Sequence, residues 1–164
     1  MHRLLELLPG VARQNWRDYA ERLLGSGEDI ATGEAFERAF EEARGVLDAP
    51  DLGHLFAGDV LSEVDISAAL PELAGDRVAG IIDKLIVGAD TVQAIDFKTN
   101  VVVPDAPETV PDGVLRQMGA YHSALEQVFP DYRIEVAILW TKTQSLMVLP
   151  HEIVRLALQA TATS

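Results

Sequence analysis

The chain has 164 residues, 48% of them hydrophobic and 24% charged, which is typical of a single globular domain with one core. It contains no cysteine, which excludes disulfides, thiolate zinc sites and iron–sulfur clusters and leaves oxygen ligands and histidine, a set suited to Mg²⁺ or Mn²⁺. Its formal net charge of −13 argues against a protein that binds DNA on its own, because neutralisation of the phosphates supplies most non-specific affinity for DNA.

Helices are expected in the N-terminal part of the chain, over 2–8, 11–24 and 28–47. Pro9-Gly10 ends the first, the segment 25–27 separates the second from the third, and Pro50 follows the third. The apolar stretch 4–8 is too short for a signal-peptide core, and no apolar run approaches the ~18 residues of a membrane span. The expected location is therefore the cytoplasm.

Strands rich in valine and isoleucine are expected at 61–68, 77–87, 91–97, 133–140 and 145–149. Further helices are expected at 114–129 and 152–160, and the segment 101–112, which contains three prolines, is expected to be a loop. Helices followed by a mostly antiparallel sheet with a late helix packed on it indicate an α/β domain. We expect one domain, with a helical part over 1–50 and a sheet core with the active site over 55–164.

The second and third of these strands are separated by a short polar segment that begins with Gly88, which is typical of a β-hairpin. If the turn is centred just after Ala89, Asp83 lies opposite Asp96, and their Cβ atoms are roughly 4.5–5.5 Å apart on one face. Lys98 follows Asp96 by two residues, so strand alternation puts it on the same face. Two carboxylates this close repel each other unless a cation lies between them or one is protonated.

Two aspartates and a lysine on one face form the set that phosphodiester hydrolysis needs. A carboxylate-bound metal lowers the pKa of a bound water, and a lysine can position that water or offset charge on the phosphate. A solvated Asp96–Lys98 pair is the simpler interpretation, but the apolar flanks 81–82 and 94–95 make unpaired charges costly there. A salt bridge would leave the second aspartate unexplained, and a register shift of one residue would break the geometry.

Three motifs resemble those of RecB-like PD-(D/E)XK nucleases. Gly80–Asp83 and Asp96–Thr99 resemble the G-x-x-D and D-[YF]-K-T motifs, and Gln117–Tyr121 resembles Q-x-x-x-Y. The segment Met1–Pro9 resembles the helix that carries the family's metal-binding histidine, here His2. In this order the segments are similar to the C-terminal nuclease domain of AddA-type helicase–nuclease subunits. The resemblance implies a restriction-endonuclease-like α/β fold, with a mixed, mostly antiparallel central sheet flanked by helices.

The resemblance also implies a metal site and a catalytic set. The metal ligands would be His2, Asp83, Asp96 and the carbonyl oxygen of Phe97. The cation would be Mg²⁺, with Mn²⁺ as a substitute, and no iron–sulfur cluster is expected because the cysteines are absent. Asp83, Asp96 and Lys98 would be the catalytic residues.

Further residues take supporting roles by the same resemblance. Gln117 and Tyr121, four apart on one helix face, would support the site or contact DNA, and Glu63 fits an acidic position on the preceding strand. The family's proline before the first aspartate is replaced by Ile82, and the residues that precede its histidine are missing because the chain starts at Met1. We therefore expect an excised domain whose histidine lies on a frayed end.

Several other polar residues have a simpler interpretation. His54, His122 and His151 are more typical of surface or capping residues than of ligands. Lys84 directly follows Asp83, so alternation sends it to the opposite face, where a structural role is expected. The glutamates of the third helix, Glu34, Glu37, Glu41 and Glu42, are most simply a solvated face.

The implied activity is that of a Mg²⁺-dependent DNA exonuclease acting on single-stranded or unwound ends, within an AddAB/RecBCD-type helicase–nuclease of double-strand-break repair and recombination. The sequence has no G-x-x-x-x-G-K-[ST] phosphate loop, so helicase activity would lie elsewhere in the same polypeptide, and a second nuclease subunit would be a partner. Tethering to such a machine would offset the acidic charge by raising the effective concentration of DNA. The alternatives are an inactive nuclease-fold scaffold or DNA-end-binding module, and an acidic protein-interaction domain.

Overall fold

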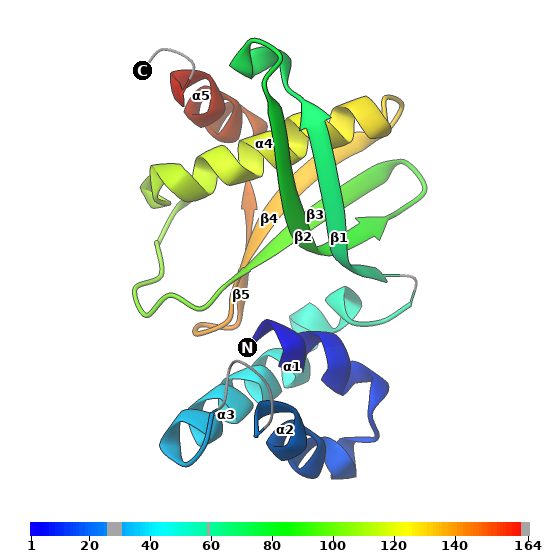
Figure 1. Cartoon of the computed structure of the whole chain (residues 1–164), viewed down its shortest axis with the longest axis vertical. Coiled ribbons are helices and arrows are strands. Elements are labelled where there is room, and N and C mark those ends of the chain that lie inside the picture. The colour runs from blue at the N-terminus through cyan, green and yellow to red at the C-terminus, as the bar shows by residue number, and fades with distance from the viewer. Residues whose placement is uncertain (26–30, 59, 162–164) are drawn as a thin grey trace.

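The computed structural model of the chain describes residues 1–25, 31–58 and 60–161. Three N-terminal helices lie against one side of a sheet whose other side carries two further helices (Figure 1). The helices are α1 His2–Leu7, α2 Trp16–Leu24, α3 Glu34–Asp48, α4 Asp112–Val128 and α5 His151–Thr161. The strands are β1 Val60–Ala69, β2 Arg77–Val87, β3 Thr91–Lys98, β4 Arg133–Trp140 and β5 Ser145–Leu149. The chain thus has an α/β fold, and within the described ranges no helix is long and apolar enough to cross a membrane.

The five strands form one mixed sheet in the order β1-β2-β3-β4-β5. β3 and β4 are parallel, and every other neighbouring pair is antiparallel. The parallel pair needs a crossover, which α4 provides between β3 and β4. In the β2–β3 hairpin, Val87 pairs with Val92 and Lys84 with Ile95, which confirms the register expected from a turn centred after Ala89.

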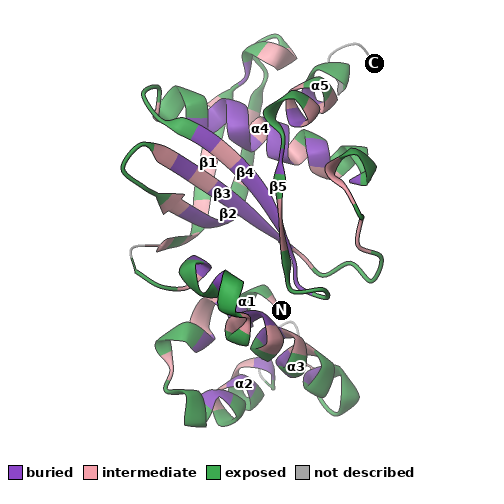
Figure 2. Ribbon diagram, turned by 180° about the vertical axis from the view of Figure 1, so that it is seen from behind, coloured by how far each residue is buried: buried purple, intermediate pink, exposed green. Residues whose placement is uncertain are grey.

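The central strands are apolar on both faces because each face covers a separate core. One face packs on α4 and α5 through residues such as Ala94, Val136 and Ile138. The other packs on the N-terminal helices, through the buried residues Ile95, Phe97, Ala137 and Leu139. Burial along β3 and β4 is accordingly almost continuous (Figure 2). This burial on both sides is what makes any charged side chain in these strands exceptional.

Two helices begin later than the sequence pattern predicts. A 3₁₀ turn over Arg13–Asn15 precedes α2, which begins at Trp16 rather than at residue 11. Gly33, directly before α3, has φ +57° and ψ −132°, a backbone conformation that is strained for residues other than glycine. The helix therefore begins at Glu34 rather than at residue 28, and positions 28–30 lie outside the described residues.

The β1–β2 hairpin changes its packing partners at Glu63. This residue has φ +52°, in the left-handed region that is uncommon for a non-glycine residue. Ile82 and Ile86 lie on the same face of β2 by alternation, but Ile86 packs on the N-terminal core and Ile82 on the α4 core. The hairpin must therefore twist or bend between them, at the level of Glu63 and Asp83.

Candidate active site

The ladder between β2 and β3 ends immediately before the two aspartates. Among its described pairs, Lys84–Ile95 is the last in that direction, so Asp83 and Asp96 come next in register without being backbone partners. In place of the ladder, the backbone N–H of Phe97 donates a hydrogen bond of 2.6 Å to Asp83 Oδ2. The carboxylate thereby satisfies a buried backbone donor at the point where the strands part.

The chain start brings a histidine to Asp83. His2 Nδ1 lies 3.2 Å from Asp83 Oδ1, and the His2 ring stands edge-on to Phe97 with centroids 5.8 Å apart. The hydrogen bond to Asp83 raises the pKa of His2, while burial opposes that shift. α1 is held in place because Leu4 and Leu5 are fully buried in the N-terminal core. The position of His2 therefore depends on packing between the helical part and the sheet.

A second carboxylate completes this group. His2, Glu63 and Asp83 each offer one ligand atom within 4.8 Å of the others. Burial raises the pKa of Glu63, and the nearby charge of Asp83 adds to the shift. Both causes reflect negative charge gathered in a partly desolvated place, which a cation would relieve.

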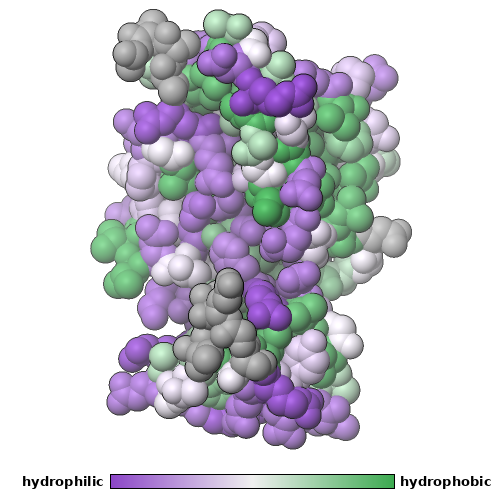
Figure 3. All heavy atoms as spheres, viewed as in Figure 1, coloured by the Kyte–Doolittle hydropathy of each residue, from purple (hydrophilic) through white to green (hydrophobic). Residues whose placement is uncertain are grey.

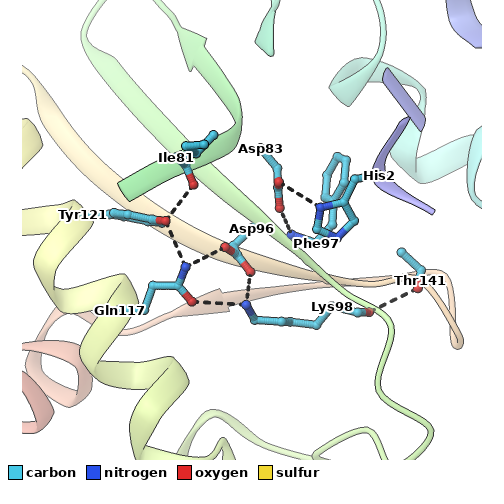
Figure 4. Close-up of polar contacts among 9 residues, drawn as sticks. All are labelled: His2, Ile81, Asp83, Asp96, Phe97, Lys98, Gln117, Tyr121 and Thr141. Atoms are coloured by element: carbon cyan, nitrogen blue, oxygen red, sulfur yellow. Dashed lines mark hydrogen bonds and ion pairs between the residues drawn. The ribbon is translucent and has the colours of Figure 1, made fainter. Parts of the chain in front are cut away.

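Asp96 lies in a separate network with Lys98 and Gln117 (Figure 4). Lys98 Nζ is 2.6 Å from Asp96 Oδ2 and donates a hydrogen bond of 3.1 Å to Gln117 Oε1. Gln117 Nε2 in turn donates to Asp96 Oδ1 at 3.2 Å. Each of the three side chains thus contacts the other two. Burial raises the pKa of Asp96, and the positive charge of Lys98 acts in the opposite direction.

One oxygen of Asp96 remains without a hydrogen bond. Asp96 is only 4% exposed, and its buried Oδ2 accepts no hydrogen bond of acceptable geometry from the part of the chain that the structure describes. Lys98 Nζ lies 2.6 Å from this atom, so an ion pair offsets part of its charge. The group of His2, Glu63 and Asp83 is rich in carboxylate oxygens and fits a divalent cation that prefers oxygen ligands, and Asp96 lies next to Asp83 in the register of the two strands.

Tyr121 connects this network to β2. Its hydroxyl accepts a hydrogen bond of 2.9 Å from Gln117 Nε2 and donates one of 2.6 Å to the carbonyl oxygen of Ile81. The ring lies so close to the strand that a Cβ atom on Gly80 would be 2.9 Å from Tyr121 Cε1. The glycine three residues before Asp83 therefore makes room for the tyrosine, which gives a physical reason for its place in the motif.

The structure places the predicted site residues in two neighbouring groups, one of His2, Glu63 and Asp83 and one of Asp96, Lys98, Gln117 and Tyr121. Phe97 contacts the site through its N–H, which donates to Asp83, and through its ring, which packs on His2. The expectation that its carbonyl oxygen binds metal remains a prediction. Lys84 lies beside Asp83 in sequence but donates to Ser62 Oγ at 2.6 Å and lies 5.5 Å from the Phe56 ring centroid, and burial lowers its pKa.

The sequence did not reveal two residues near Lys98: Thr141, which bonds to its carbonyl oxygen, and Glu42, which contacts Thr141. The carbonyl oxygen of Lys98 accepts hydrogen bonds from Thr141 N at 3.0 Å and Thr141 Oγ1 at 3.1 Å. Thr141 Oγ1 also contacts Glu42 Oε1 at 2.5 Å, so α3 is tied to the end of β3. The solvated-face interpretation is therefore wrong for Glu42, whose side chain is 15% exposed. Nothing in the local sequence separates it from the other glutamates of its helix, because its partners, Thr141 and Lys142, follow β4 about a hundred residues later in the chain.

Comparison with known protein families finds no matching family, and comparison with curated proteins finds no matching relative. The functional interpretation therefore depends on the motifs and on the geometry of the site.

Proposed function

We propose that this chain is a Mg²⁺-dependent deoxyribonuclease domain of the PD-(D/E)XK class, which hydrolyses phosphodiester bonds in single-stranded or unwound DNA. The observation that carries this proposal is that Asp83 and Asp96 come next to each other in register where β2 and β3 part, with Lys98 at 2.6 Å from Asp96 and His2 at 3.2 Å from Asp83. The mixed sheet with a crossover helix that carries Gln117 and Tyr121 supports the fold part of the proposal.

The cation would be held by His2, Glu63, Asp83 and Asp96, with Mg²⁺ or Mn²⁺ favoured because most of these donors are carboxylate oxygens. When bound, such a cation stabilises charge on the scissile phosphate and lowers the pKa of a water molecule. The carboxylates by themselves would repel a phosphate, so their role in this proposal depends on the metal.

Lys98 would supply positive charge to the phosphate from the other side of the site. Its ammonium group has three N–H donors, and the contacts with Asp96 and Gln117 account for two of them. The third can reach a phosphate oxygen or the attacking water. Gln117 fixes the ammonium group and Asp96 relative to each other, and Tyr121 fixes Gln117 against β2.

The charge of the chain indicates how DNA would reach this site. Hydrophilic and hydrophobic residues are mixed over the face shown in Figure 3. The formal net charge of −13 makes non-specific attraction of DNA weak. We infer that DNA is delivered by attached partners, namely the helicase part of an AddAB/RecBCD-type enzyme and a second nuclease subunit. The high local concentration of DNA in such an assembly would replace intrinsic affinity.

The test is degradation of single-stranded DNA in Mg²⁺ by the chain and by any longer polypeptide that contains it. Asp96→Asn and Lys98→Ala should each lower the rate by about 100-fold or more, by analogy with the removal of one electrostatic group from other active sites. Asp90→Asn, in the β2–β3 turn, and Lys142→Ala, whose side chain is half exposed, are matched controls that should keep the rate. Unchanged degradation in the Asp96 and Lys98 variants would exclude this site.

The acidic charge also favours a second candidate, a nuclease-fold module that binds DNA ends without cutting them. That candidate predicts binding of DNA ends with no Mg²⁺-dependent degradation by the wild-type protein, also when it is assayed within the longer polypeptide.

A further inference from the structure

A second group of metal-ligating side chains lies between α4 and α5. His122 and Glu126 are four residues apart on α4, hence on one face, and His151 is the first residue of α5. Each of the three offers one ligand atom within 4.8 Å of the others. The two helices approach closely here, since a Cβ atom on Gly119 would lie 2.4 Å from the carbonyl oxygen of Val154.

The group is compact and partly enclosed. The rings of His122 and His151 stack with centroids 4.2 Å apart at an interplanar angle of 6°, and His122 Nδ1 is 3.5 Å from Glu126 Oε2. His122 is only 6% exposed, whereas Glu126 and His151 are exposed. Beside them is a hollow of about 10 Å³, close to the space that one water molecule or ion occupies.

We propose that His122, Glu126 and His151 form a binding site for a transition-metal ion of the Zn²⁺ type, which links α5 to α4. Two imidazoles and one carboxylate suit Zn²⁺, Co²⁺ or Ni²⁺, unlike the oxygen-rich group at Asp83, which suits Mg²⁺. Three protein ligands leave one position of a tetrahedral ion for water. This site does not depend on the nuclease proposal, because none of its residues belongs to the candidate active site.

The surroundings are compatible with a bound cation. Glu72 and Arg155 also line the hollow, but Arg155 is paired with Glu152 at 2.6 Å and hydrogen-bonded to Gln159 at 3.0 Å. Glu72 accepts a hydrogen bond of 2.8 Å from Ser123 Oγ. The charge of Glu72 adds to that of Glu126, so the electrostatic potential next to the two imidazoles favours a cation.

Metal binding would change the arrangement of the two rings. An imidazole binds a metal in the plane of its ring, so two parallel stacked rings cannot both direct a nitrogen at one ion. His151 must therefore turn, which its exposed position at the start of α5 allows, while buried His122 stays in place. Loss of the stacked geometry is a specific signature of the proposed site.

The experiment is a Zn²⁺ titration by calorimetry of the His2→Ala chain, which lacks the histidine of the candidate active site. We expect one bound equivalent and a rise in the melting temperature, because an ion that binds only the folded chain stabilises it. His151→Ala in the same background should abolish both effects, and Glu126→Gln should weaken them. Both changes are at exposed positions and should leave folding intact, and His54→Ala is the matched histidine control.

Nuclear magnetic resonance of the imidazole protons provides a readout independent of stability. Zn²⁺ should shift the signals of His122 and His151 and leave that of His54 in place. The proposal is overturned if the His2→Ala chain binds no Zn²⁺, or if His151→Ala binds it as well as its parent does.

Discussion

The two aspartates of the candidate site are held in different ways. Asp96 is fixed by side chains, Lys98 from its own strand and Gln117 from α4, all within a short stretch of sequence. Asp83 is fixed by the backbone N–H of Phe97 and by His2, which comes from the first helix of the chain. One half of the candidate site is therefore assembled locally, whereas the other depends on the helical part packing against the sheet.

The largest difference is expected when each aspartate is replaced by asparagine. Asp83→Asn weakens a buried charge-assisted hydrogen bond and should cost about 1.5–3 kcal/mol of the free energy of unfolding. Asp96→Asn should cost less than Asp83→Asn, because burial already disfavours the Asp96 carboxylate and offsets part of what the Lys98 ion pair contributes. Urea unfolding at pH 7 with EDTA measures both. Equal destabilisation by the two variants would contradict the comparison.

Gly80→Ala should lower the stability of the folded chain, because the added methyl group would collide with the Tyr121 ring near Asp83. The added Cβ would lie 2.9 Å from the tyrosine ring, which two hydrogen bonds hold in place, so overpacking should cost about 1–3 kcal/mol. Gly53→Ala, where nothing lies within 4 Å of the added atom, is the control and should change stability by less than about 0.5 kcal/mol. Thermal unfolding compares the two, and equal melting temperatures would show that Tyr121 moves away freely.

Tyr121→Phe removes the link between the two halves without changing shape. Losing its hydrogen bonds to Gln117 and Ile81 should cost about 1 kcal/mol and lower the rate of DNA degradation by less than Lys98→Ala does. Tyr132→Phe, at a partly exposed position, is the matched control. A loss of activity as large as that of the lysine variant would mean that the hydroxyl takes part in the reaction directly.

The smallest effect is the pH dependence that His2 gives to the Asp83 half of the site. The hydrogen bond to Asp83 raises the pKa of His2 in the folded chain, so its contribution to stability is complete below about pH 6.5, the ordinary value. The contribution is lost as the pH rises through the raised folded-state pKa. Without metal, the stability difference between the wild-type chain and His2→Gln should therefore shrink from pH 6 to pH 9. A difference that grows over this range would contradict the assignment.

Local patterns predicted the sheet well. β2, β4 and β5 have the bounds that their apolar, β-branched residues indicate, and the turn after Val87 set the hairpin register. The expected starts of the second and third helices were wrong because the described residues before them, 13–15 and 31–33, do not form α-helix. Periodicity reports which residues can be buried, not where a backbone turn interrupts a helix.

The residues of the candidate site could be named from the sequence, but the contacts between them could not. Asp83, Asp96 and Lys98 follow from one hairpin and from alternation, and the motifs added Gln117 and Tyr121. The hydrogen bond that replaces the ladder at Phe97 could not be foreseen, because it depends on where β2 and β3 part. The contact of Thr141 with a helix 99 residues earlier in the chain also depends on the tertiary fold alone.

The most direct test of the central claim is a crystal of the chain soaked in Mn²⁺, with the anomalous difference map measured at a wavelength where manganese scatters strongly. We expect a peak between Asp83 and Asp96, with His2 and Glu63 among the nearest side chains, and no such peak in the Asp96→Asn chain. A wild-type map without a peak between the two carboxylates, at millimolar Mn²⁺, would contradict the account.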